Sequence, residues 1–386
     1  MAKVLCVLYP DPQAGYPPPY ARDSIPEIKV YADGQTAPTP QGPLGFKPGE
    51  LVGCVSGNLG LRDYMEKNGH EFIVTSDKDS PDSVFEQHLP TADVIISQPF
   101  WPAYLTRERL EKARNLKLAL TAGIGSDHVD LKAAAEKGVT VAEVTGSNCD
   151  SVAEHIVMSI LAIVRNFLPS HTLSQAGVWN IADCVERSYD IQGMSFGTIG
   201  AGRIGLGVLE RLKPFRMPLN YTQRHRLPAE VEERLGLTFH PTIESLVSSV
   251  DIVNLSIPLY PSTENLIDAQ MLAKMKRGTY IVNCARARLV DQQAIIEAID
   301  AGHIAGYAGD VWFPEPAPLA HPWRNMRFNG MTPHISGTSL SAQARYAAGT
   351  LEILEDFFSG RPIREEYLIV HGHGLAGTGA KSYTLK

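Results

Sequence analysis

The sequence predicts an α/β protein built from two doubly wound parallel sheets, with one domain inserted into the other. Short apolar runs alternate with helical patterns along most of the 386 residues, which is typical of parallel sheets covered by helices. A glycine fingerprint, Gly200-x-Gly202-x-x-Gly205, stands near the middle of the chain. The length itself favours two domains.

The fingerprint lies in a segment with the order strand, tight turn and helix. An apolar run that begins at Phe196 precedes it, and an apolar helical face follows it through residue 212. Gly200 would permit the turn, Gly202 would let the backbone approach a phosphate, and Gly205 would let the helix pack on the strand. Later strands are expected at 219–222, 251–257 and 279–283. This context favours a Rossmann-like, dinucleotide-binding domain over an ordinary glycine-rich turn.

Composition excludes several classes of protein. Hydrophobic residues make up 44% of the chain and charged residues 20%, as in a globular protein with large cores. The formal charge of −7 and the pI near 6.0 argue against nucleic acid as a partner. No apolar run approaches the roughly 20 residues of a membrane span, and the N-terminal run closes too early for a signal peptide. The five cysteines are scattered without zinc spacing, so we expect a cytoplasmic, reduced chain with no structural metal.

The first part of the chain reads as an α/β unit without a glycine fingerprint. A strand is expected at 3–8, followed by a proline-rich segment at 10–50 that is irregular because proline cannot donate to a ladder. A helix is expected at 51–70. Further short strands are expected at 72–75, 93–97, 116–121 and 139–143.

Two helices mark the domain boundaries. Ser151 and Glu154 have the spacing of a capping box, which predicts a helix start at Ser151 and an apolar helix through Val164. A second helix is expected at 340–358, ending at Ser359-Gly360. The prediction is a substrate domain of residues 1–148 and 336–386, interrupted by a dinucleotide-binding domain of residues 149–335.

Three groups near predicted strand ends could carry chemistry. Arg286 follows the strand at 279–283, and a guanidinium fork suits a carboxylate substrate. Arg288 is expected to be the solvated arginine of the pair. His334 follows a proline, and Asp310 and Glu315 precede it in the chain. A carboxylate beside the histidine would orient its ring and favour its protonated form.

The order of these motifs resembles the D-2-hydroxyacid dehydrogenase superfamily, and within it the NAD(P)-dependent, metal-free formate dehydrogenases. The resemblance extends from Val4 to near the C-terminus and includes runs too long to match by chance. They are Ser97-Gln-Pro-Phe-Trp-Pro-Ala-Tyr104, Leu120-Thr-Ala-Gly-Ile-Gly-Ser-Asp-His128, Tyr307-Ala-Gly-Asp-Val-Trp-Phe313 and Asn329-Gly-Met-Thr-Pro-His-Ile-Ser-Gly-Thr338.

The resemblance implies roles for individual residues. Arg286 and Asn148 would grip formate, Ile124 would add a backbone contact, and Pro99 with Phe100 would wall the pocket. His334 would lie beside substrate and nicotinamide, with Asp310 on the carboxamide. The full set implied to bind the cofactor is Cys149, Gly200, Gly202, Arg203, Ile204, Gly205, Gln223, Arg224, His225, Pro258, Tyr260, Ser262, Thr263, Cys284, Asp310, His334, Ser336, Gly337 and Ser382. A homodimer through the helix after Ser151 and the region around Trp179 is also implied.

The implied reaction moves a hydride from formate to the nicotinamide and releases carbon dioxide. Formate has no hydroxyl proton to remove, so catalysis is expected to come from alignment and from a water-poor site.

The coenzyme position departs from the NAD-specific members of that family. Gln223 stands where they carry an acidic residue for the ribose hydroxyls, and Arg224, His225 and Arg226 follow it. A neutral amide removes the repulsion of a 2′-phosphate and Arg224 adds attraction. We therefore expect NADP to be accepted and preferred, with NAD as the other coenzyme.

Glu315 is a second departure, because formate dehydrogenases typically carry Gln there. A His–Glu pair shuttles the hydroxyl proton in hydroxyacid enzymes, so a D-2-hydroxyacid dehydrogenase or glyoxylate reductase using Arg286, Glu315 and His334 is the alternative function. A dinucleotide-sensing protein without turnover is a third possibility. Tyr260, Cys149 and Cys284 also differ from the family's usual residues, and a cysteine beside the cofactor invites oxidation if its thiol is exposed and acidic.

Overall fold

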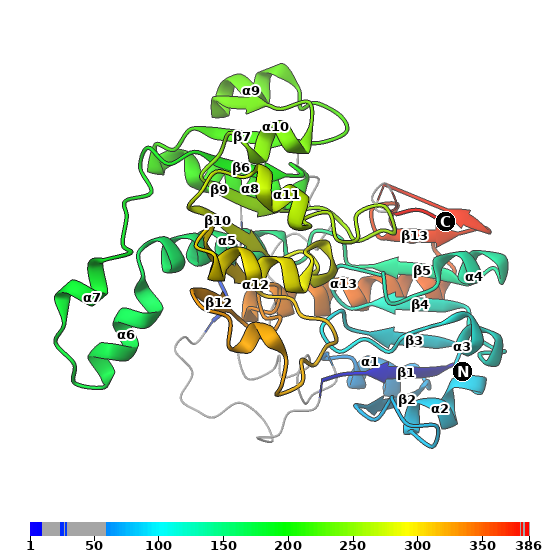
Figure 1. Cartoon of the computed structure of the whole chain (residues 1–386). Helices are drawn as coiled ribbons and strands as arrows, with labels where there is room; N and C mark the ends of the chain where they lie inside the picture. The colour runs from blue at the N-terminus through cyan, green and yellow to red at the C-terminus, as the bar shows by residue number, and fades with distance from the viewer. Residues whose placement is uncertain (10–23, 27, 29–58, 379, 381–382, 386) are drawn as a thin grey trace. The chain divides into compact units, whose positions relative to one another are not determined.

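The computed structural model describes residues 1–9, 24–26, 28, 59–378, 380 and 383–385 (Figure 1). Most of the proline-rich segment at 10–50, residues 51–58 of the expected helix and the expected cofactor residue Ser382 lie outside the described residues. The chain divides into two compact units. Of the described residues, 1–9, 24–26, 28, 59–148 and those from 337 onward belong to the first unit, and Cys149–Ser336 form the second.

The first unit is organised around a seven-stranded sheet in the order β14-β13-β5-β4-β3-β1-β2. Strands β1 to β5 pair in parallel, and β13 runs antiparallel to β5. The bounds are β1 (Lys3–Val7), β2 (Glu71–Thr75), β3 (Val94–Ser97), β4 (Leu118–Thr121), β5 (Thr140–Glu143), β13 (Leu368–His371) and β14 (Gly374–Leu375). Every residue of β3 and β4 is buried, as expected for a parallel sheet covered on both faces.

The helices of this unit begin at polar caps. Ser83, Thr106 and Asp130 each accept a hydrogen bond from the backbone N–H three residues later, which satisfies one of the free donors at a helix start. The helices are α1 (Arg62–Lys67), α2 (Val84–His88), α3 (Arg107–Lys112), α4 (Leu131–Glu136) and α13 (Leu340–Ser359). The end of α13 at Gly360, which has φ of +71°, agrees with the sequence prediction.

The helix expected at 51–70 is shorter than predicted within the described residues. Leu59 and Gly60 have positive φ, and α1 begins only at Arg62 and ends at Lys67. Two consecutive left-handed residues cannot continue a right-handed helix, so the apolar periodicity overstated its length.

The second unit contains a seven-stranded, wholly parallel sheet in the order β12-β11-β10-β9-β6-β7-β8. The chain order reverses between β6 and β9, which is the topological switch point of a doubly wound fold. The strands are β6 (Phe196–Ile199), β7 (Leu219–Thr222), β8 (Leu237–Phe239), β9 (Ile252–Leu255), β10 (Thr279–Asn283), β11 (Ile304–Gly309) and β12 (Asn329–Met331). The two sheets confirm the predicted fold class.

Six of this unit's helices flank the sheet or connect its strands. They are α5 (Cys149–Val164), α8 (Arg203–Leu212), α9 (Ala229–Leu235), α10 (Ile243–Val247), α11 (Ala269–Lys274) and α12 (Gln292–Asp300). Helix α5 packs against α8, β10 and β11. It begins at Cys149, so Ser151 lies in its first turn and the predicted capping-box start is two residues late.

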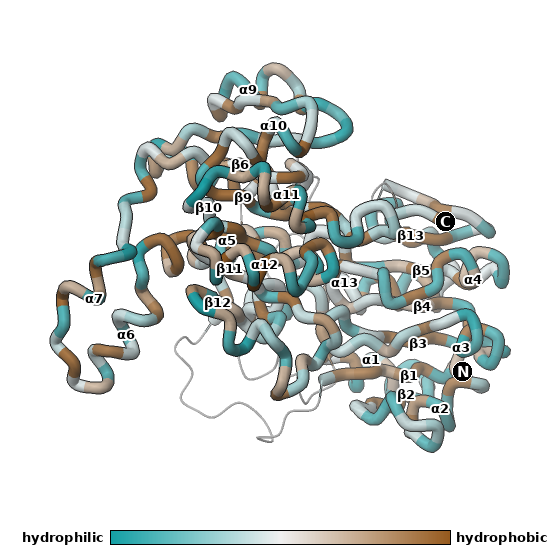
Figure 2. The backbone as a smooth tube through the Cα atoms, viewed as in Figure 1, coloured by the Kyte–Doolittle hydropathy of each residue, from teal (hydrophilic) through white to brown (hydrophobic). Residues whose placement is uncertain are grey.

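Two further helices, α6 (Phe167–Gln175) and α7 (Ile181–Val185), have no buried residue. They form an arm beyond α5, and brown, apolar stretches occur along it (Figure 2). Among the described residues, no single helix is long and apolar enough to cross a bilayer; α5 and α6, bent by 68°, pass that test only as a pair.

Candidate active site

The glycine fingerprint forms a cradle between β6 and α8. Gly200 has φ of +93°, and a Cβ added there would lie 2.3 Å from the Ser256 carbonyl oxygen. A Cβ on Gly205 would lie 2.1 Å from the Gly200 carbonyl oxygen, whereas one on Gly202 would meet open space. Gly202 is also the N-cap of α8, and no side chain caps that helix. The open space and the free helix N-terminus fit a pyrophosphate.

The loop after β7 is shaped by Gln223. Its Oε1 accepts a hydrogen bond from Ala201 N at 3.1 Å, and its Nε2 donates to His225 O at 2.5 Å. Arg226 forms a two-bond ion pair with Glu232 at 2.7 and 2.8 Å. Arg224, His225 and Arg226, the basic residues expected to supply positive charge, are all exposed, and Arg226 is paired with Glu232.

The loop after β9 carries four of the expected cofactor residues. Thr263 Oγ1 accepts from Tyr260 N at 2.7 Å and donates to Pro258 O at 3.0 Å, so this side chain closes a compact turn; Ser262 lies within it. The turn follows the carboxyl end of β9, which adjoins β6 at the switch point. Ligands of doubly wound folds bind at that edge.

Asp310, which is fully buried, organises the loop after β12. Its Oδ1 accepts from Thr332 Oγ1 at 2.5 Å and Ile335 N at 2.8 Å, and its Oδ2 accepts from Ser336 N at 2.6 Å. His155, whose side chain is 10% exposed, lies 3.1 Å from Thr332 Oγ1, and its partial burial lowers its pKa. Three bonds to one carboxylate fix the loop that contains His334.

His334 and Glu315 form a close pair. Nδ1 of His334 lies 2.7 Å from Oε2 of Glu315, and the two side chains are 16% and 14% exposed. The second oxygen of Glu315 accepts from Trp312 N at 2.8 Å. His334 itself has φ of +56°. The carboxylate therefore fixes the orientation of the imidazole and leaves Nε2 as the ring nitrogen directed away from the pair.

Arg286 lies in the turn directly after β10. The side chain of Asn283 shapes this turn, because its Nδ2 donates to Arg286 O at 2.9 Å and its Oδ1 accepts from Ala285 N at 3.0 Å. Arg286 is partly buried, whereas Arg288 pairs with Glu264 at 2.6 Å and is 41% exposed. The exposure of Arg288 is that expected of a solvated arginine, and the role of Arg286 in the site stays a prediction.

The substrate residues expected in the first unit follow three adjacent parallel strands. Pro99 and Phe100 follow β3, Ile124 follows β4, and Asn148 follows β5. A Cβ added to Gly123 would lie 3.3 Å from Pro99 Cδ, and one on Gly337 would lie 2.5 Å from Asn148 Nδ2. The structure thus brings Pro99 against the loop of Ile124, and Asn148 against Gly337.

A buried carboxylate holds the loop that contains Ile124. Glu143 Oε2 accepts hydrogen bonds from Gly125 N at 3.0 Å, Ser126 Oγ at 2.9 Å and the Tyr383 hydroxyl at 2.7 Å. The same hydroxyl accepts from Ser126 N at 2.9 Å. The C-terminal part of the first unit is therefore joined to β5 and to the loop directly after Ile124.

Helix α13 holds the residue that precedes Asn148. Arg345, which is 3% exposed, donates through Nε to Ser147 O at 2.5 Å. Oδ1 of Asn148 is buried and has no hydrogen-bond partner among the described residues. Sequence reasoning missed Arg345, Glu143 and Tyr383, because each acts through a partner distant in the chain.

The cysteines beside the expected site are sheltered. Cys149 is 2% exposed and Cys284 is 8% exposed. Burial, and then the nearby Asp310 carboxylate, raise the pKa of the Cys284 thiol well above its ordinary value. Among the described residues, no group of three or more His, Cys, Asp or Glu side chains is placed to hold a metal ion.

The switch point and the open glycine cradle are those of a doubly wound, dinucleotide-binding enzyme fold. Residues 157–336 match the family model described as D-isomer specific 2-hydroxyacid dehydrogenase, NAD binding domain.

Relatives that match the whole chain narrow the class. The sequence is 64% identical over 384 residues to a formate dehydrogenase of Pseudomonas sp. (strain 101), covering 100% of this chain and 96% of that protein. The structure matches a formate dehydrogenase of Granulicella m. with a TM-score of 0.93, at 64% identity over 98% of this chain and 100% of that one. It also matches an NAD-dependent formate dehydrogenase from Staphylococcus aureus in complex with NAD. The TM-score is 0.77 and the identity 41%, and the match covers 95% of this chain and 99% of that one. The chain belongs to the formate dehydrogenase family.

Proposed function

We propose that this protein oxidises formate to carbon dioxide and reduces a nicotinamide coenzyme. One observation carries the proposal: residues suited to a small carboxylate follow the carboxyl ends of parallel strands in both units. Arg286 follows β10 in the second unit, and Asn148, Ile124 and Phe100 follow β5, β4 and β3 in the first. Similarity to formate dehydrogenases along the whole chain supports formate as the carboxylate.

Each side chain has a separate task in this proposal. The Arg286 guanidinium and the Asn148 amide donate to the formate oxygens, and Pro99 with Phe100 excludes water from the anion. A nicotinamide held at the glycine cradle would supply an electrophilic C4 as the hydride acceptor. Formate and the oxidised coenzyme become carbon dioxide and the reduced coenzyme, so no proton is left to transfer. Alignment and removal of water are the main sources of rate.

NADP is the coenzyme that the loop after β7 favours. Gln223 is neutral where a carboxylate would repel a 2′-phosphate, and Arg224 beside it is exposed. The ion pair between Arg226 and Glu232 commits that arginine elsewhere, so Arg224 is the main source of positive charge. NAD is also expected to be accepted, since an amide can hydrogen-bond to the ribose hydroxyls.

The 2.7 Å contact between His334 and Glu315 favours a second, weaker activity. A protonated His334 could donate a proton to the carbonyl oxygen of a small oxoacid such as glyoxylate as the reduced coenzyme gives its hydride. This is general acid catalysis, and the Glu315 carboxylate holds the imidazole ring in position for it. Formate oxidation does not need that proton.

A homodimer is the proposed assembly, with the arm of α6 and α7 at its interface. Six large apolar side chains of this arm are exposed: Phe167, Leu168, Val178, Trp179, Ile181 and Val185, at 43% to 88%. An apolar surface of this kind is typical of a protein interface. A cytoplasmic location also remains a proposal, which cell fractionation tests.

The deciding experiment measures reduced coenzyme formed from formate with NADP and with NAD at matched concentrations. Formate turnover with NADP favoured supports both the substrate and the coenzyme proposals. Turnover that favours NAD would support formate oxidation and would contradict the role proposed for Arg224. Absence of formate turnover, with rapid reduction of glyoxylate, would establish the hydroxyacid alternative.

The carboxylate role is tested by a matched pair of arginine variants. Arg286→Ala should lose formate turnover by about a hundredfold or more while coenzyme binding survives, because the substrate loses its fixed cation. Arg288→Ala removes a neighbouring arginine that pairs with Glu264, so its turnover should stay near that of the parent. Equal losses in both variants would contradict the assignment.

A further inference from the structure

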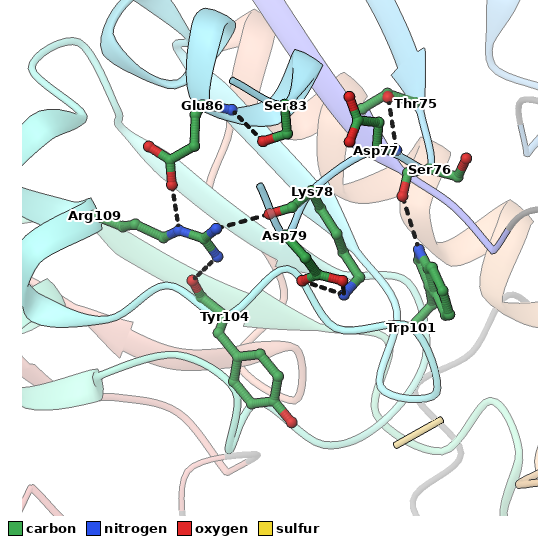
Figure 3. Close-up of polar contacts among 10 residues, drawn as sticks. All are labelled: Thr75, Ser76, Asp77, Lys78, Asp79, Ser83, Glu86, Trp101, Tyr104 and Arg109. Carbon is green, nitrogen blue, oxygen red and sulfur yellow. Dashed lines mark hydrogen bonds and ion pairs between the residues drawn. The ribbon is translucent and has the colours of Figure 1, made fainter. Parts of the chain in front are cut away.

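Trp101, which follows Phe100, is hydrogen-bonded to the loop after β2 (Figure 3). Nε1 of Trp101 donates to the Ser76 carbonyl oxygen at 3.2 Å, and its backbone N donates to the Gln98 carbonyl oxygen at 3.3 Å. The first bond holds Trp101 to the loop after β2. The second folds residues 98–101, which include Pro99 and Phe100, into a tight turn.

A buried lysine lies against the ring of Trp101. The ammonium of Lys78 is 4.6 Å from the ring centroid and binds both oxygens of Asp79, at 2.8 and 2.9 Å. Lys78 is 4% exposed and Asp79 is 70% exposed. A cation–π contact strengthens when the ammonium is removed from water, so Lys78 fixes the ring as well as the loop.

Arg109 joins this loop to the far end of the Phe100 segment. Its Nη2 donates to Lys78 O at 2.7 Å, its Nη1 donates to Tyr104 O at 2.9 Å, and its Nε binds Glu86 at 2.7 Å (Figure 3). The guanidinium carbon also lies 4.9 Å from the centroid of Phe85. One planar fork therefore connects α2, the loop after β2 and the segment at residues 98–105.

We propose that Trp101, Lys78 and Arg109 are positioning residues that set the place of Phe100 and thereby the affinity for formate. This inference rests on the proposed function, in which Phe100 walls the substrate site. Trp101 fixes the chain directly beside Phe100, and Arg109 fixes it again at Tyr104. A wall that moves admits water to the formate anion, so binding of formate is lost before binding of coenzyme.

Three conservative variants test the arrangement. Trp101→Phe keeps an aromatic ring and removes the indole N–H, Lys78→Met keeps the stem and removes the charge, and Arg109→Lys keeps the charge and removes the fork. Arg107→Lys is the matched control, because Arg107 lies on the same helix and its ion pair with Glu136 is about half exposed.

The readout is the KM for formate, the KM for coenzyme and kcat, with thermal unfolding recorded for each variant. We expect the KM for formate to rise on the order of tenfold in the three variants, with kcat falling less and the KM for coenzyme within about twofold. Arg107→Lys should match the parent in all three quantities.

Two results would overturn the inference. Folded variants whose KM for formate stays within about twofold of the parent show that the segment does not depend on these contacts. Equal rises in both KM values show a general structural role instead. A parent protein without formate turnover defeats the proposed function itself, so the two failures are distinguishable. If Lys78→Met does not fold, the KM values of Trp101→Phe and Arg109→Lys still decide whether the positioning role holds.

Discussion

Removing one hydroxyl, in Tyr383→Phe, should release the loop that carries Ile124. That hydroxyl donates to Glu143 at 2.7 Å and accepts from Ser126 N at 2.9 Å. Ser126 and Glu143 are 0% and 2% exposed, so water cannot readily replace either bond. A hydrogen bond to a charged group contributes about 1.5–3 kcal/mol, and a buried N–H left without a partner costs about 1–3 kcal/mol.

The expected loss of stability is therefore about 3 kcal/mol in the first unit, equivalent to about a 150-fold shift in an equilibrium. Burial and the Glu143 carboxylate raise the pKa of Tyr383 well above its ordinary value. The hydroxyl therefore stays protonated across the neutral range, and the loss should be independent of pH there.

The assay combines urea unfolding with amide hydrogen exchange at residues 125–128. Tyr383→Phe should speed exchange at Ser126, because local opening becomes easier, and should raise the KM for formate through Ile124. Tyr189→Phe, which removes a hydroxyl from a side chain that is 53% exposed, is the control. A change of less than about 0.5 kcal/mol, within the range of ordinary surface substitutions, together with unchanged exchange at Ser126, would refute the reasoning.

Three further predictions concern the coenzyme, the histidine and the cysteines. Gln223→Asp should shift the NADP/NAD ratio of kcat/KM towards NAD by at least about tenfold, since a carboxylate repels the 2′-phosphate. Gln223→Asn is the neutral control. An unchanged ratio in the Gln223→Asp variant would contradict the argument. Glu315→Gln should leave formate oxidation within about threefold and reduce glyoxylate reduction, measured as coenzyme oxidation; a rise in oxoacid activity would show that the carboxylate does not assist His334. Cys284, whose buried thiol has a raised pKa, should remain unlabelled by iodoacetamide at pH 8.5 in the folded protein, while the more exposed Cys184 reacts. Peptide mass spectrometry measures the labelling of both cysteines. Rapid labelling of Cys284 would show that the region around it opens.

Local sequence patterns predicted the elements on which the expected site is built. Strands at 219–222 and 279–283 were placed at their observed bounds, because a short buried run between turn residues has few alternatives. The predicted start of α5 at Ser151 is wrong by two residues. Ser151 and Glu154 have the right spacing for a cap, yet packing against α8 and the sheet extends the helix to Cys149. A capping preference of about 1 kcal/mol is smaller than the free energy of burying another turn.

The sequence by itself determined the fold class, the phosphate cradle and the identity of the candidate site residues. Those depend on spacing within short segments and on steric demands such as the turn at Gly200. Only the tertiary structure decided which partners hold these residues in place. Glu143 and Tyr383 are 240 positions apart, and Arg226 is committed to Glu232 although it follows Gln223 closely. Hydrogen bonds between distant segments leave no periodic trace in a sequence, because they form only after the chain has folded and water has been excluded.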